Sequence, residues 1–205
     1  VTAANNLNWV PRPVFQSYIT YTPFLDRANH DFFNSARAPE FLVWHYHSFA
    51  DIDNRQPLSS DPLTLEAILR HYRQVGCEGV FCLWQRSATP LLDPGTVSPA
   101  VTARWDEWIP LPAAAGDIVR AQVTVARTLA GKANLAVWKE GDAELDYRLR
   151  DGSIRTHRLL LDNAASGLWA SPYLNTLQPL SRPQALTVAE REALLRAMPA
   201  EGYIE

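Results

Sequence analysis

The sequence has few lysines, few glycines and no long apolar run. Its 205 residues include 19 basic and 22 acidic side chains, a formal net charge of −3, and its only lysines are Lys132 and Lys139. Proteins that bind nucleic acid usually display a basic stripe, so this balance disfavours a nucleic-acid partner. No run of about 18 apolar residues is present, so no segment is predicted to span a bilayer. The nine glycines are not grouped, which disfavours a phosphate-binding loop.

Catalytic signatures are missing as well. There is no G-x-S-x-G motif for a serine nucleophile, and the segment around Ser166 lacks the first glycine of that motif. The chain does not start with the charged, apolar and small-residue parts of a signal peptide. Because it begins at Val1 and its single methionine is Met198, we expect a processed chain or an excised domain. No catalytic residue and no cofactor are predicted.

The two cysteines, Cys77 and Cys82, are too few to hold a structural zinc ion, which needs four ligands. The residues around them predict a hairpin that turns at Glu78-Gly79. In this register each cysteine faces a valine on the other strand, and the Cβ atoms are staggered. A disulfide needs Cβ atoms about 4 Å apart. We therefore expect two thiols, with Cys82 buried.

Residues 1–90 predict a small α/β unit in the order helix, strand, helix and hairpin. Thr22 followed by proline is typical of a helix start, and we expect a helix over residues 22–33. Strands are expected at 39–47 and 79–87, where aliphatic and aromatic residues dominate. The predicted apolar stripe of the first helix consists of Phe24, Leu25, Ala28 and Phe32.

The clearest helical pattern covers residues 59–76. Asp61 is the expected N-cap, and Pro62 suits the first turn. Four apolar residues follow at the i, i+3, i+4 and i+7 spacing of one helix face. They are Leu65, Ile68, Leu69 and Tyr72.

A proline-rich segment at 88–99 marks the expected boundary to a second part of the chain, and one compact domain overall stays open as the alternative. Residues 100–180 predict short strands separated by turns, with a strong hairpin turn at Asp151-Gly152. The expected architecture is an antiparallel β-sandwich, jelly-roll-like, so that the fold class is α+β. Residues 181–205 are expected to form a C-terminal helical segment. A capping box opens this helix at Thr187, and its apolar face consists of Val188, Leu194, Leu195 and Met198.

Two histidines two residues apart raise the question of a metal site. On a strand His45 and His47 point to the same face, and Asp51 or Asp53 could add an oxygen ligand. A catalytic zinc ion needs three protein ligands, and the spacing places only two. We therefore favour a strand whose histidines point toward solvent or a neighbouring helix. His45, His47 and Asp51 are kept as a less favoured candidate metal site.

The aspartates that follow are expected in a turn, because aspartate and asparagine readily bond to nearby backbone groups. Arg55 could pair with either carboxylate, and we favour a structural ion pair. An acid/base pair would need Asp51 and Asp53 in different environments.

Seven tryptophans are a surplus for a chain of this size, and Trp105, Trp108, Trp138 and Trp169 lie in or beside the β-rich half. Exposed rings on a sandwich face could bind sugar rings, whereas buried rings would fill the core. We favour core packing and keep ligand binding as the alternative. The candidate ligand-binding residues are Trp108, Trp138, Trp169, Asp53 and Arg55.

Six segments, at 9–29, 37–62, 69–76, 80–86, 105–131 and 148–174, carry a resemblance that covers most of the chain. They resemble the soluble C-terminal part of large, mostly uncharacterised bacterial inner-membrane proteins. Their many-helix membrane portion is similar to glycosyltransferases that use polyprenyl-linked sugars. In their pattern the first turn has the sequence I-D-G-R, where this chain has Ile52, Asp53, Asn54 and Arg55. Asparagine can replace glycine at positive φ, so the same turn is expected.

The resemblance implies a soluble domain on the extracytoplasmic, periplasmic side of the inner membrane, as part of a larger membrane protein. It implies no reaction for this fragment. Our leading hypothesis is a non-catalytic accessory domain that binds a glycan or lipid-linked sugar and contacts its own membrane-embedded portion. The alternatives are a protein-interaction or scaffold domain and a metal-dependent hydrolase.

Overall fold

A computed structural model gives the structure of the chain. Within the described residues no helix is both long and apolar enough to cross a membrane. The described residues are 8–16, 19–45, 53–111, 118–129, 131–133, 143–174 and 199–204.

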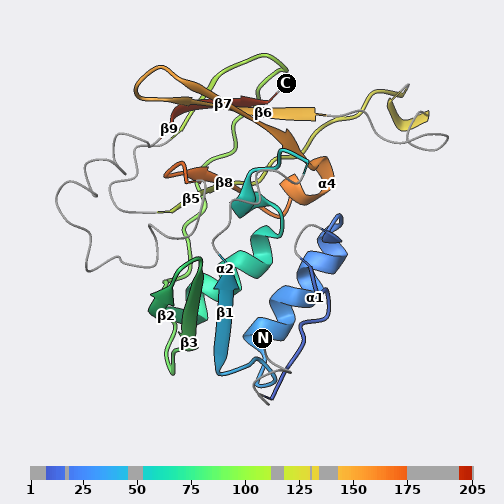
Figure 1. Cartoon of the computed structure of the whole chain (residues 1–205). Coiled ribbons are helices and arrows are strands. Elements are labelled where there is room, and N and C mark those ends of the chain that lie inside the picture. Colours follow the sequence, from blue (N-terminus) through green and yellow to red (C-terminus); the bar gives the residue numbers. More distant parts are fainter. Residues whose placement is uncertain are drawn as a thin grey trace.

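Helices and antiparallel sheets are mixed, which confirms the α+β class (Figure 1). A three-stranded sheet has the order β1-β3-β2, a four-stranded sheet the order β4-β9-β6-β7, and β5 pairs with β8. The first part consists of α1 (Pro23–Asn34), β1 (Phe41–His45), η4 (Pro57–Ser59), α2 (Pro62–His71), β2 (Tyr72–Glu78) and β3 (Phe81–Arg86). The second consists of β4 (Ile109–Pro110), β5 (Val119–Ala121), β6 (Ala143–Leu149), β7 (Ile154–Leu159), α4 (Leu161–Ala164), β8 (Leu168–Ser171) and β9 (Pro199–Ile204).

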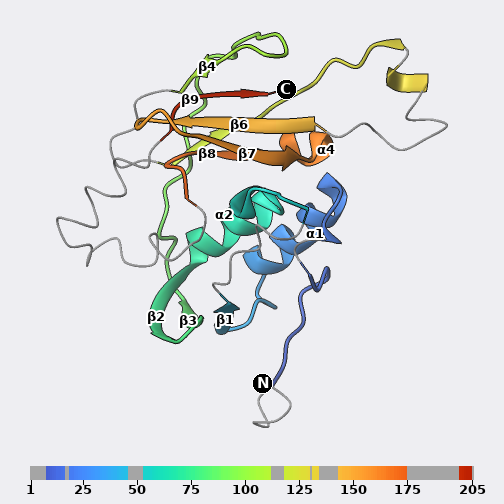
Figure 2. The ribbon, with the colours of Figure 1, turned by 45° about the horizontal axis from the view of Figure 1, so that its top comes forward.

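The elements are stacked in layers. In Figure 2, α1 and α2 lie between the three-stranded sheet and the strands of the second part, whereas Figure 1 shows α1 beside β1. The main core forms where α1 and α2 meet β3, and Trp169 of β8 belongs to the same cluster. A second cluster lies beneath β6 and β7, against α4 and β8.

Helix α1 begins at the predicted cap but buries a different face. The Oγ1 of Thr22 accepts a hydrogen bond from the Leu25 N–H at 3.3 Å. Of the predicted apolar stripe, Phe32 is buried, Leu25 and Ala28 are half-buried and Phe24 is exposed, so the stripe is only partly correct. The helix also buries two polar side chains that bond to other segments, and apolar spacing cannot reveal such a face. Its buried residues are Asp26, Asn29, Phe32 and Phe33.

Helix α2 starts as predicted, but its N-terminus is capped by another helix. Asp61 occupies the N-cap position without a capping side-chain bond. The Asp26 carboxylate of α1 accepts the backbone N–H groups of Leu63 and Thr64, each at 2.9 Å. It also accepts the Thr64 hydroxyl at 2.7 Å. The helix ends at His71, earlier than expected, because the chain continues directly into strand β2.

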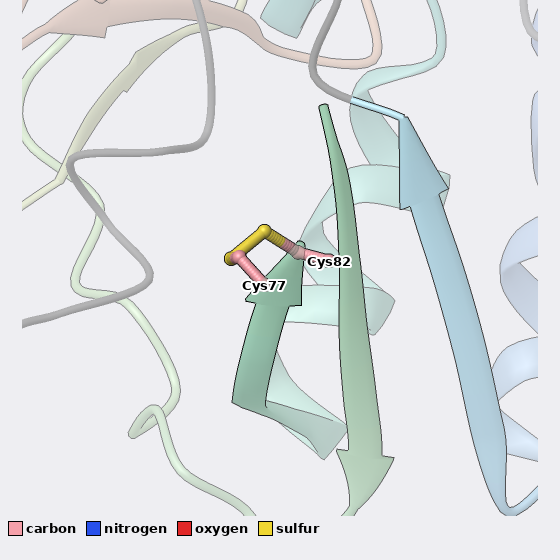
Figure 3. The surroundings of a disulfide bond; sticks show 2 residues. All are labelled: Cys77 and Cys82. Atoms are coloured by element: carbon pink, nitrogen blue, oxygen red, sulfur yellow. A yellow bond between two sulfur atoms is a disulfide. The ribbon is translucent and has the colours of Figure 1, made fainter. Parts of the chain in front are cut away.

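The hairpin of β2 and β3 is confirmed, whereas its register and the state of its cysteines are corrected. Its two-residue loop is Gly79-Val80, one position later than predicted, and Gly79 has φ +58°, which suits glycine. Cys77 therefore lies directly opposite Cys82, with Cα atoms 4.0 Å apart, and the two form a disulfide (Figure 3). The expectation of two thiols is wrong, although Cys82 is buried as predicted.

The disulfide closes a short loop, with a sequence separation of 5. Closing such a loop restricts the unfolded chain and stabilises the fold by about 2 kcal/mol. We expect the Cys77→Ala/Cys82→Ala double variant to lose about that much free energy of unfolding in a urea titration. The matched control is the original chain under reducing conditions, which should unfold at nearly the same urea concentration as the variant. Equal stability of the oxidised and reduced chains would contradict this expectation.

The second part contains the hairpin predicted at Asp151-Gly152, with Gly152 at φ +83° between β6 and β7. Alternate residues of β6 are buried, as a strand with one wet face requires. The strand expected across 118–127 is shorter, since only Val119–Ala121 is paired. The jelly-roll sandwich stays a prediction.

The helix expected from Thr187, with Val188, Leu194, Leu195 and Met198, lies outside the described residues. Residues 199–204 are corrected from helix to strand, because β9 lies between β4 and β6 and pairs with both. Strand pairing with β6 satisfies backbone groups that a helix would bond internally.

The two predicted parts share hydrogen bonds and core. Trp169 and Leu174 belong to the core cluster of α1, α2 and β3. The buried Gln56 amide donates to the Leu174 carbonyl at 2.9 Å, and Arg120 of β5 forms an ion pair with Glu66 of α2. Residues from both sides of the proline-rich segment therefore build one core.

Candidate functional site

The predicted pair of Asp53 and Arg55 ties the first part of the chain to β7. Asp53 and Asn54 have φ values of 57° and 51°, so the turn expected from the resemblance is confirmed. The Asp53 carboxylate contacts Arg55 at 2.7 Å and Arg158 of β7 at 3.1 Å. Arg55 is 3% exposed, and its guanidinium lies 4.8 Å from the ring centroid of Tyr21. This arrangement is a structural cross-link in which Arg55 is buried and the Asp53 side chain is 43% exposed, as the hypothesis of an ion pair expected.

A cavity beside this cross-link is too small for an organic ligand. Its volume is about 10 Å³, and its lining includes Arg55, Gln56, Ser59 and His157. About one water molecule fits into such a space. Sugars and other organic ligands need clefts of several hundred Å³. Asp53 and Arg55 are thus placed together, but not in a ligand pocket.

His157 of β7 is a buried titratable group that the sequence patterns did not single out. Its Nε2 lies 2.8 Å from the hydroxyl of Tyr173, and the two rings stack with centroids 5.9 Å apart. Burial lowers the pKa of His157, which favours the neutral ring. Buried and less buried residues alternate at the end of β7, where His157 and Leu159 are both buried. This alternation is the signal that places the His157 side chain inward. Its contacts are those of a packed core histidine.

The metal candidate is only partly described. His45 ends β1, and its ring centroid lies 4.9 Å from that of Phe81. His47 and Asp51 lie outside the described residues. In the described part of the chain no three histidine, cysteine, aspartate or glutamate side chains gather where they could hold a metal ion.

Of the tryptophan candidates, the two that the structure describes, Trp108 and Trp169, do not form a common platform. Trp169 is buried, and its Nε1 donates to the Pro172 carbonyl at 2.5 Å, so its ring is not available to a surface ligand. Trp108 is half-buried, and the guanidinium of Arg148 lies 4.4 Å from its ring centroid. Trp138 lies outside the described residues.

An acidic pair lies at the start of α2, where Asp61 and Asp26 approach each other. Arg12 of the N-terminal segment contacts the Asp61 carboxylate at 3.2 Å. Burial raises the pKa of Asp61 to about 7; the charge of Arg12 opposes this shift and that of Asp26 adds to it. Asp26 is fully buried and bonded to α2. These contacts therefore give Asp26 and Asp61 a structural role.

The three-stranded sheet differs from these structural sites, because apolar side chains are exposed on one of its faces. Residues directly paired in a sheet share a face, so the pairing places Trp84 and Cys82 toward the helices and their neighbours Phe81 and Leu83 away from them. The side turned away from the helices is called here the outer face. Its apolar residues are Phe41, Val43, Val75, Phe81 and Leu83, each between 39% and 56% exposed.

Polar residues lie at the ends of the outer face. Arg73 pairs with Gln85, which pairs with Phe41, at one end of the strands. At the other end Glu78 pairs with Phe81, which pairs with His45. The middle row contains Val43 and Leu83, with the bulged part of β2 beside them. The face is therefore an apolar band that includes Phe41 and Phe81 in its end rows, with polar residues beside them at each end.

Sequence reasoning missed the outer face. Its signal was the unbroken apolar runs at 41–44 and 80–84, because a strand with one wet face alternates apolar and polar residues. Such runs are typical of strands covered on both sides.

Comparisons with protein-family models, with curated proteins and with solved structures find no match for this chain.

Proposed function

We propose that the chain is a non-catalytic accessory domain of a bacterial membrane protein, located on the extracytoplasmic side, which binds another protein surface through its outer face. The observation that carries this proposal is the exposed apolar band of β1, β2 and β3. Contiguous apolar surfaces with polar rims mark sites of interaction on soluble domains. The protein-interaction hypothesis accounts for this band, whereas the glycan hypothesis does not use it.

The disulfide supports the proposed location. Disulfides form and persist in oxidising compartments such as the periplasm, and are rare where thiols are kept reduced. Cys77 is exposed at the edge strand β2, so a reducing compartment would have access to the bond. Together with the resemblance, this favours the periplasmic side of the inner membrane.

The remaining hypotheses keep less support. Glycan binding relied on Trp108, Trp138 and Trp169, which the described structure does not bring together. The metal-dependent hydrolase needs His47 and Asp51, which lie outside the described residues. A jelly-roll-like sandwich in the second part remains compatible with its two antiparallel sheets and is proposed only as architecture.

A photo-crosslinking experiment tests the interaction. A photoreactive amino acid replaces Val43 in the protein expressed from its whole reading frame, and replaces Val97 in the matched control, since Val97 is 96% exposed but distant from the sheet in sequence. We expect irradiation of intact cells to give a covalent adduct from position 43, with the attached polypeptide identified by mass spectrometry. An adduct yield from position 43 no higher than from position 97 would refute the proposal.

A further inference from the structure

We propose that the outer face binds the outer face of a second copy of this chain. The two sheets are related by a two-fold axis that lies in the plane of the interface and runs perpendicular to the strands. This inference rests on the proposed function and names its partner. It depends on the order of residues across the sheet and on the charges at its two ends.

The charges on β2 are self-complementary. Arg73 and Glu78 lie near opposite ends of this strand, and the pairing places both on the outer face. Neither has an ion pair within the described residues. A two-fold axis perpendicular to the strands reverses the strand direction in the second copy. Arg73 of each copy then lies over Glu78 of the other, and two ion pairs form.

The same operation places the middle row over its own counterpart. The middle row lies on itself, so Val43 and Leu83 face their own counterparts and exclude water. Face-to-face sheets pack about 10 Å apart with interdigitating side chains, which suits aliphatic residues in this row. A two-fold axis parallel to the strands would instead place Arg73 of one copy over Phe41 of the other. That arrangement forms no ion pair.

The rim does not favour a lipid surface. Interfacial membrane-binding surfaces usually carry several basic residues that attract anionic lipids. The end rows hold one arginine and one glutamate, both on β2, together with Gln85 on β3 and His45 on β1. This balanced rim fits an isologous interface, in which one patch must complement itself.

The contact is small, so the dimer should be weak. Three strands of about five residues cover roughly 15 by 17 Å, which is less than a standard protein interface. We expect a dissociation constant in the micromolar range or weaker. A shared membrane would raise the effective concentration of two tethered copies.

Sedimentation equilibrium of the 205-residue chain, up to about 1 mM, measures the dimer directly. We expect Leu83→Lys to weaken dimerisation at least tenfold, because it places two charges against each other in the middle row. The matched control Val97→Lys should leave the dissociation constant unchanged. A chain that is monomeric at every concentration, or a dimer indifferent to Leu83→Lys, overturns the proposal. Circular dichroism verifies that each variant is folded.

Charge reversal tests the two-fold arrangement. Arg73→Glu and Glu78→Arg should each weaken the dimer several-fold, while an equal mixture of the two variants should associate. The Arg73→Glu/Glu78→Arg double variant should return to within about twofold of the original affinity, since its ion pairs are restored in reverse. Failure of the double variant to recover would refute this arrangement.

Two further outcomes separate this inference from the proposed function. Cross-linking from position 43 to a different, identified polypeptide, with the purified chain monomeric, overturns the dimer and leaves an interaction domain. Binding of the monomeric chain to phosphatidylglycerol vesicles, lost in Leu83→Lys, overturns the dimer in favour of a membrane surface. An adduct that contains two copies of the chain supports both proposals.

Discussion

Replacing Asp26 with alanine is expected to lower the free energy of unfolding by about 3 kcal/mol. The carboxylate is fully buried and accepts three hydrogen bonds from the first turn of α2. Its removal leaves two buried backbone N–H groups without their acceptor, and the Thr64 hydroxyl keeps only the backbone carbonyl of residue 26, at 3.3 Å. Each such loss costs about 1 kcal/mol or more.

A urea titration of Asp26→Ala measures this effect. The matched control is Asp31→Ala on the same helix, since the Asp31 side chain is 66% exposed and should change stability by less than about 0.5 kcal/mol. Asp26→Asn keeps one amide oxygen as acceptor and should fall between the two. Equal effects at positions 26 and 31 would show that the cap contributes little.

The second large effect concerns pH. Burial raises the pKa of Asp61 from 3.8 to about 7 in the folded chain. Between these two values the folded state binds a proton that the unfolded state has released. Stability contributed by this proton is therefore present at low pH and lost as pH rises toward 7. The full loss is on the order of 4 kcal/mol, at about 1.4 kcal/mol for each pKa unit.

Asp61→Asn removes this titration and should be the more stable protein at about pH 8, with the difference shrinking toward pH 4. The measured quantity is the difference between the unfolding free energies of the two proteins across that range, which cancels other titrating groups. Asp93→Asn, in an exposed loop, is the matched control and should give a flat difference. A flat difference for Asp61→Asn, or one that grows toward acid pH, would contradict the raised pKa.

Patterns that depend on neighbouring residues predicted their structures well. The Thr22 cap, the Asp151-Gly152 turn and the start of α2 at Pro62 each involve contacts within a few positions along the chain. Those contacts are encoded locally, so their sequence signatures are reliable. The structural ion pair of Arg55 was also expected, because its partner Asp53 is two residues away.

Features that depend on distant residues could not be predicted in this way. The buried face of α1 is partly polar because Asp26 bonds to α2, which lies 37 residues further along the chain. The cysteines were misjudged because a hairpin turn shifted by one position changes every cross-strand pair. Trp169 is buried by helices that the sequence assigned to another unit.

The shared core limits where the polypeptide can be divided. The proline-rich segment at 88–99 has the composition of a linker, yet a fragment that ends there would lack Trp169 and Leu174, which belong to the same core cluster as residues of α1, α2 and β3. Large buried side chains cannot be removed without leaving a void of comparable size. Truncation of the protein at this segment would therefore leave each fragment with an incomplete core.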